Sequence, residues 1–90
     1  MLFMAIFTYE PGQRNEVVKK RLQGPAIPEG IKIIGEWVTI SGGRSFRILE
    51  VPDAKLGLAA SLPWTDLGKL DLIPVMDTEE AVKLAAQSQT

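Results

Sequence analysis

Charged side chains interrupt the most apolar part of the sequence, which runs from Ile31 to Val51. Glu36, Arg47 and Glu50 stand there among isoleucine, valine, leucine and aromatic residues. A carboxylate removed from water can have its pKa raised until it acts as an acid or base, and a nearby arginine can hold a polar ligand. The structural alternative is an ion pair across the hairpin or a dimer interface, or simple placement at an exposed strand end; Glu36 and Arg47 are close enough in the predicted pairing for their side chains to meet. Because structural ion pairs often imitate functional ones, we favour this alternative.

The two tryptophans could form an aromatic wall for a flat ligand. In a chain of 90 residues they are more simply its largest packing contributions. We expect Trp37 to lie beneath a helix and Trp64 at the end of one. Both join Glu36, Arg47 and Glu50 as candidate ligand-binding residues, and no residue is assigned a catalytic role.

Four further features have simpler explanations than chemistry. Tyr9 and Asp66 could flank the mouth of a cavity, but each adjoins a turn containing proline or glycine, and Asp66 is a natural turn cap. The basic run 19–21 suits the exposed C-terminal end of a helix. The segment 42–44 is glycine-rich, yet no helix begins after it, so the feature that makes phosphate loops work is missing.

Composition narrows the classes of function. The chain has neither cysteine nor histidine, so disulfides and the common zinc, copper and haem ligands are absent, and we expect no metal or cofactor. Ten basic and 11 acidic side chains give a net charge of −1, which argues against nucleic-acid binding. The apolar start is too short to cross a bilayer, so we expect a cytoplasmic protein without membrane contact. Residues 1–90 are expected to form one domain.

The pattern of apolar residues, prolines and glycines predicts the elements that position these side chains. They are a strand over 2–9, a helix over 13–22, a loop over 24–30, a hairpin over 31–51, a helix from the N-cap Asp53 to Leu62, a strand over 70–76 in which Pro74 favours an edge or an end, and a helix over 78–87. This order is the split βαβ pattern of a ferredoxin-like α+β fold, with both principal helices on one face of a four-stranded antiparallel sheet.

The hairpin is apolar on both faces, which a sheet covered on one side does not need. A two-residue loop at 42–43 places Trp37 opposite Ile48, and Glu36 diagonal to Arg47 on the face that carries Leu49. Helices can cover one face only. We therefore predict a homodimer through the other face, and assign the Leu49 face to the interface; a one-residue slip would exchange the faces.

Several short segments of the chain resemble a known family. They are Met1-Leu2-Phe3-Met4, Glu36-Trp37-Val38, Gly43-Arg44-Ser45-Phe46, Ile48-Leu49-Glu50, Trp64-Thr65-Asp66-Leu67 and Asp71-Leu72-Ile73-Pro74-Val75-Met76. Over residues 1–84 the chain resembles the uncharacterised bacterial family called domain of unknown function 3303, which is similar to the dimeric α/β-barrel superfamily. The resemblance implies a homodimer with two sheets packed face to face. It implies no reaction, since that superfamily includes monooxygenases, isomerases and stress-responsive proteins.

Two functions follow as hypotheses. The first is a non-catalytic homodimer that binds a small organic ligand or serves as an interaction module. The second is a cofactor-independent enzyme, an oxygenase or isomerase, that uses a cavity between helices and sheet. A cavity below about 300 Å³ near the charged strand residues would argue against the second.

Overall fold

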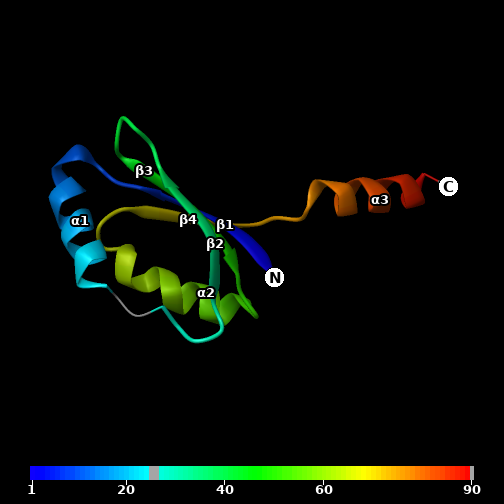
Figure 1. The fold of residues 1–90 in the computed structure, drawn as a ribbon, viewed down its shortest axis with the longest axis horizontal. Coiled ribbons are helices and arrows are strands. Elements are labelled where there is room, and N and C mark those ends of the chain that lie inside the picture. The colour runs from blue at the N-terminus through cyan, green and yellow to red at the C-terminus, as the bar shows by residue number, and fades with distance from the viewer. Residues whose placement is uncertain (25–26, 90) are drawn as a thin grey trace.

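Four strands form one antiparallel sheet in the computed structural model, which describes residues 1–24 and 27–89. The strands are β1 (Leu2–Thr8), β2 (Lys32–Val38), β3 (Arg44–Glu50) and β4 (Lys69–Pro74), in the order β2-β3-β1-β4 across the sheet (Figure 1). Residues 25 and 26 of the predicted connecting loop lie outside the described residues. β4 is an edge strand and Pro74 is its last residue, as predicted.

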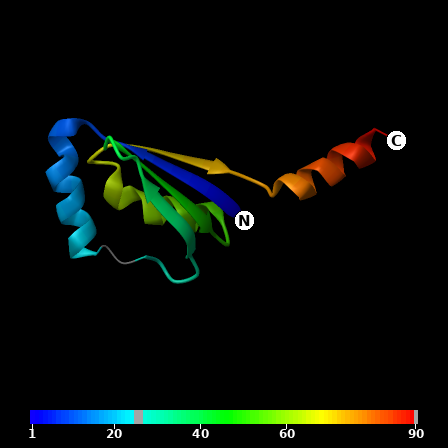
Figure 2. The ribbon, with the colours of Figure 1, turned by 45° about the horizontal axis from the view of Figure 1, so that its top comes forward.

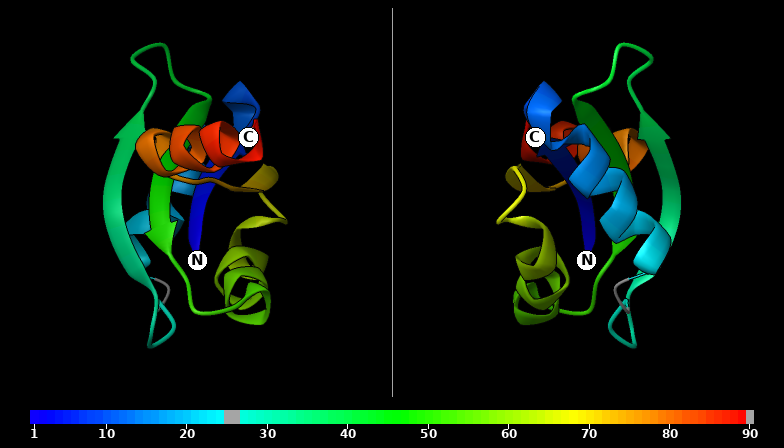
Figure 3. Two further views of the ribbon diagram at one scale, coloured as in Figure 1. Left: turned by 90° about the vertical axis from the view of Figure 1, so that its right-hand side faces the viewer. Right: turned by 90° about the vertical axis from the view of Figure 1, so that its left-hand side faces the viewer.

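The helices follow the predicted order, and α1 and α2 lie on the same face of the sheet (Figures 1 and 3). A short 3-10 turn, η1 (Pro11–Gln13), leads into α1 (Arg14–Gln23), and α2 (Ala54–Ser61) runs into a second, η2 (Leu62–Trp64). This arrangement confirms the ferredoxin-like α+β fold. Among the described helices, none combines the length and apolar character that a membrane crossing requires.

The last helix, α3 (Thr78–Ser88), projects away from the sheet instead of packing on it (Figure 2). Its N-cap is Asp77, whose carboxylate accepts hydrogen bonds from the backbone of Glu79 and Glu80. Asp53 caps α2 in the same way, through the Leu56 amide. Both helix starts were predicted from the sequence.

The core lies between the sheet and α2. Phe3, Ala5, Leu49 and Val51 form its buried centre. Gly57 of α2 faces this layer so closely that a Cβ there would lie 3.1 Å from the side chain of Leu72. The helix therefore packs tightly at this point, and adding even a methyl group would force a neighbour to move.

The position of Leu49 overturns the predicted interface face. Its side chain is 6% exposed and packs in the core beneath α2. In the antiparallel register Leu49 lies opposite Phe3, and Arg47 lies opposite Ala5, so these residues share the helix-covered face. Because both faces of the hairpin are apolar, the residue pattern could not distinguish the covered face from the open one.

The hairpin turn is longer than predicted. β2 ends at Val38 and β3 begins at Arg44, and Gly42 and Gly43 both have positive φ, as expected for adjacent glycines in a turn. Trp37 is consequently opposite Phe46 instead of Ile48. This two-residue difference leaves the parity of the pairing unchanged, so Glu36 still shares a face with Arg47, now directly opposite it.

A bulge in β2 changes the positions of two further side chains. The register shifts between Ile33 and Gly35, so that Ile33 lies opposite Leu49 and faces the core. Regular alternation along the strand would place Ile34 with Glu36 on the Leu49 face, but Ile34 is exposed. An inserted residue of this kind changes the alternation of side chains that sequence patterns rely on.

The face of the sheet away from α1 and α2 remains uncovered. Its centre is apolar and follows the pairing of strands. Ile6, Phe46 and Trp37 form one row, which ends at Asp71 on the edge strand, and Met4, Ile48 and Ile73 lie in the next. Trp37 is 57% exposed and its indole lies across Gly35, where a Cβ would approach the ring to 2.5 Å. The prediction that Trp37 lies beneath a helix is therefore wrong.

Candidate ligand-binding cavity

A cavity of about 410 Å³ lies between the covered face of the sheet, α1 and the end of α2. It forms because α1 stands away from the strands, without close packing of its backbone on them (Figure 2). Its walls are mainly apolar: Val17, Val18 and Leu22 from α1, Ile27, Pro28 and Ile31 from the following loop, Ala5, Phe7, Ile33, Val38, Leu49 and Leu70 from the sheet, and Ala60, Pro63 and Trp64 from α2 and η2.

An ionic cluster stands at one side of the cavity. Arg47 Nε donates to Glu36 Oε2 across the two strands. Arg21, from α1, contacts the same carboxylate through both terminal nitrogens, at 2.9 Å to Oε2 and 2.7 Å to Oε1. The predicted ion pair between Glu36 and Arg47 is thus confirmed, with Arg21 as a second partner that links α1 to the sheet.

The cluster keeps Glu36 ionised. Burial alone raises the pKa of this carboxyl, but the hydrogen bonds and charges of Arg47 and Arg21 together outweigh that effect and leave the pKa below its ordinary value. The hypothesis that burial turns Glu36 into a proton acceptor near neutral pH is therefore not supported. A carboxylate with a lowered pKa, bound to two guanidinium groups, is a weak base.

Trp64 contacts both the ionic cluster and the aromatic ring of Phe7. Its ring meets Phe7 edge to face, with centroids 5.9 Å apart, and the Arg47 guanidinium carbon lies 6.0 Å from the indole centroid. Lys20 lies 5.9 Å from the same ring and 3.6 Å from the Asp66 carboxylate. The aromatic face near Arg47 can therefore favour a cation or a flat ligand group beside it.

The structure brings three of the five predicted site residues together, namely Glu36, Arg47 and Trp64. Trp37 projects from the opposite face of the sheet. Glu50 lies at the end of β3, where its Oε1 accepts a hydrogen bond from the Met1 amine at 2.8 Å. A site that uses all five residues would have to span both faces of the sheet.

Sequence reasoning missed the contribution of α1. The sequence predicts a solvated helix end for the basic run 19–21, yet Arg21 forms an ion pair with Glu36 and Lys20 with Asp66. A signal was present, because Arg21 follows Val17 by four residues and Val18 by three, which places all three on one side of a helix. The thin apolar stripe of α1 lines the cavity.

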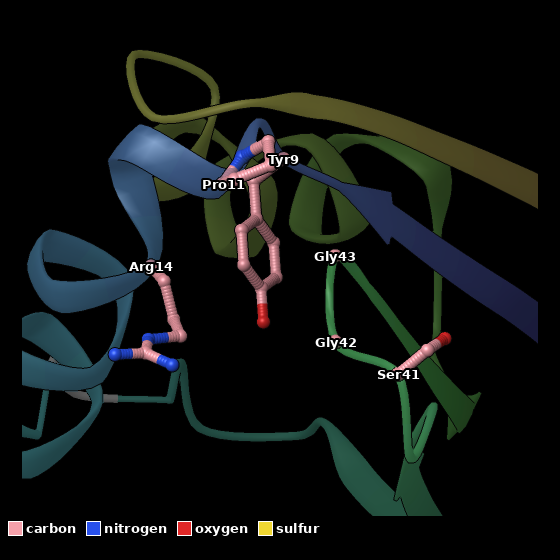
Figure 4. Close-up of a pocket in the computed structure, with 6 residues that line it drawn as sticks. All are labelled: Tyr9, Pro11, Arg14, Ser41, Gly42 and Gly43. Atoms are coloured by element: carbon pink, nitrogen blue, oxygen red, sulfur yellow. The ribbon is translucent and has the colours of Figure 1, made fainter.

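A smaller hollow of about 200 Å³ lies where η1 and the start of α1 face the hairpin turn. Figure 4 shows the Tyr9 hydroxyl and the Arg14 guanidinium directed into this opening, with Ser41, Gly42 and Gly43 across from them. Tyr9 also lines the larger cavity, the alternative that the sequence offered but did not favour. Within residues 1–24 and 27–89, no group of three acidic side chains is arranged to hold a metal ion.

Comparison with known proteins identifies a family. No curated protein and no solved structure shows significant similarity to this chain. One family model, described as Domain of unknown function (DUF3303), matches residues 1–89, nearly the whole sequence. The chain therefore belongs to the DUF3303 family.

Proposed function

We propose that this protein binds a small, mainly apolar organic molecule in the cavity between α1 and the sheet, without catalysing a reaction. The cavity itself is the observation that carries the proposal. Its volume of about 410 Å³ lies within the roughly 300–1,000 Å³ of known small-molecule sites. It combines apolar walls with one group of charged side chains, as such sites do.

Binding is preferred over catalysis because of the state of Glu36. Both arginines next to it stabilise its charge, so it is poorly suited to remove a proton from a substrate. The sequence also has no histidine or cysteine to act in its place. Of the proposed ligand-binding residues, we retain Glu36, Arg47 and Trp64 for this cavity.

A cofactor-independent enzyme is the second candidate, and the size of the cavity next to the charged residues favours it. We infer from the fold and from the resemblance of the sequence that the family is a branch of the dimeric α/β-barrel superfamily, in which such enzymes occur. Turnover of a small aromatic compound that disappears in Glu36→Gln or Arg47→Ala would establish this second function instead. The bacterial origin and cytoplasmic location expected from the sequence stay predictions.

We further propose that two copies pair through the open face of the sheet, and that residues 1–90 act as one domain. Support comes from the apolar rows on that face and from α3, which extends away and leaves them uncovered. The interface is thus assigned to the side carrying Phe46 and Ile48. Contiguous apolar side chains left open to solvent on one face are typical of an association site.

A panel of small organic molecules tests the ligand proposal by thermal shift. A ligand at 100 times its Kd should raise the free energy of unfolding by about 2.7 kcal/mol. Ala60 lines the cavity, whereas its neighbour Ala59 is exposed on α2. The shift should therefore disappear in Ala60→Phe and persist in the matched control Ala59→Phe. Equal shifts in both variants, or no shift with any compound, would contradict the proposal.

A further inference from the structure

The charges around the cavity do not cancel. Among the described residues that line it, the charged side chains are Arg21, Arg47 and Glu36. Two guanidinium groups and one carboxylate leave an excess of one positive charge. Lys20 and Asp66 lie just outside and neutralise each other. A ligand with one negative charge would therefore balance the cluster.

The donors of Arg47 are only partly used. Its Nε donates to Glu36, while its two terminal nitrogens have no hydrogen-bond partner within residues 1–24 and 27–89. The side chain of Arg47 is 24% exposed, so the side chain as a whole is partly withdrawn from bulk water. A guanidinium edge with two parallel N–H groups matches the two oxygens of a carboxylate.

Arg21 has a different role from Arg47. Both of its terminal nitrogens are directed at Glu36, one to each carboxylate oxygen. It therefore helps to compensate the charge of Glu36 and to hold α1 in place. The same contacts occupy both oxygens of Glu36, which leaves that carboxylate little capacity to receive a cationic ligand.

Resting on the function proposed above, the geometry points to a ligand class: we propose that the cavity selects organic monoanions, a carboxylate on an apolar body. The carboxylate binds the two free terminal nitrogens of Arg47. The apolar body fills the space between Val17 and Val18 of α1 and Phe7 of the sheet. A cationic head group would instead meet two guanidinium charges.

Three probes that share a naphthalene ring and differ in the charge of the attached group separate the contribution of that group to binding from the contribution of the ring. They are 2-naphthoate, 2-naphthalenemethanol and 2-naphthylmethylammonium, titrated by isothermal calorimetry at fixed salt. Naphthoate should bind about tenfold tighter than the alcohol, since a hydrogen-bonded charge pair is worth that much. The ammonium compound should bind weakest. Equal binding of all three overturns the monoanion inference but leaves the binding function intact; binding of none counts against both.

Variants of Arg47 and Glu36 test whether these residues cause the preference for naphthoate over the alcohol. Arg47→Gln should abolish the advantage of naphthoate over the alcohol, while Arg47→Lys should keep part of it, because lysine retains the charge without the fork. Glu36→Gln should increase the advantage, since it removes the internal competitor. Arg14→Gln is the matched control, because Arg14 lies at the separate small hollow. An unchanged preference in both Arg47 variants, or an equal loss in Arg14→Gln, would overturn the inference.

Discussion

Glu36 connects two arginines that belong to different elements, one on α1 and one on β3. Since its pKa is lower in the folded protein than in the unfolded chain, its ionised form stabilises the fold. That stabilisation is complete above the unfolded pKa of about 4.3 and is lost as pH falls through the folded pKa. The side chain of Glu36 is 29% exposed, and its two arginine partners are also partly accessible to water. The contribution of this cluster to stability is therefore modest.

Glu36→Gln should consequently lower the free energy of unfolding by about 1 kcal/mol at pH 7. The difference from the wild type should shrink between pH 7 and pH 3, as the wild-type carboxyl begins to take up a proton. Urea denaturation at both pH values measures it. Glu29→Gln, at an exposed loop position, is the control and should show no such pH dependence. A difference that stays constant between pH 7 and pH 3 would show that the charge of Glu36 is not its source.

Leu49 provides a second test at the scale of a residue. As a buried member of the core, its change to alanine should cost about 2–5 kcal/mol, because the substitution leaves a cavity beneath α2. Chemical denaturation gives this value directly. If Leu49 lay on an exposed interface, as the sequence suggested, Leu49→Ala would change the association state with a smaller effect on unfolding of the subunit.

At the scale of elements, two helices have similar caps but different surroundings. Asp53 caps α2, which packs on the core, whereas Asp77 caps α3, which extends away from the sheet. Asp53→Ala should lower the free energy of unfolding by about 1 kcal/mol. Asp77→Ala should leave the main thermal transition unchanged. Differential scanning calorimetry compares the two, and equal losses would mean that α3 folds as part of the core.

The elements themselves were predictable, because strong local signals mark them. Asp53 before a helical run, Pro74 in the last strand and the adjacent glycines of the hairpin all have the positions expected of them. The bulge at Ile34 was not predictable, since an inserted residue leaves no mark in an apolar strand. Nor could the pattern identify the covered face, because both sides of the hairpin are apolar.

The candidate site was predictable in part. Side chains alternate between the two faces of a strand, and this alternation correctly placed Glu36 and Arg47 on one face. The predicted pairing was wrong by two residues, which does not change the face of any side chain. Trp64 also lies where expected, after the second helix. The spacing of Arg21 places it on the apolar side of α1, but the strand residue that it contacts depends on tertiary packing, which short-range spacing does not determine. Trp37 was misplaced for the same reason as Leu49.

For the whole molecule, the open sheet face leads to a test of association. Phe46 lies at the centre of that face, between Ile6 and Trp37. Light scattering should give twice the chain mass for the wild type at micromolar concentration and the single mass for Phe46→Glu, since a buried unpaired charge opposes pairing. Ile40→Glu, at a fully exposed position beyond the end of β2, should remain dimeric. A monomeric wild type would contradict the proposed dimer.

The way α1 is attached should affect how fast a ligand enters and leaves the cavity. Ion pairs of Arg21 and Lys20, instead of close backbone packing, fasten this helix over the pocket. Dissolved ions screen ion pairs far more than they weaken hydrophobic contacts. Concentrated salt should therefore weaken the attachment of α1, so that a ligand of the proposed class binds and dissociates faster while the sheet stays folded.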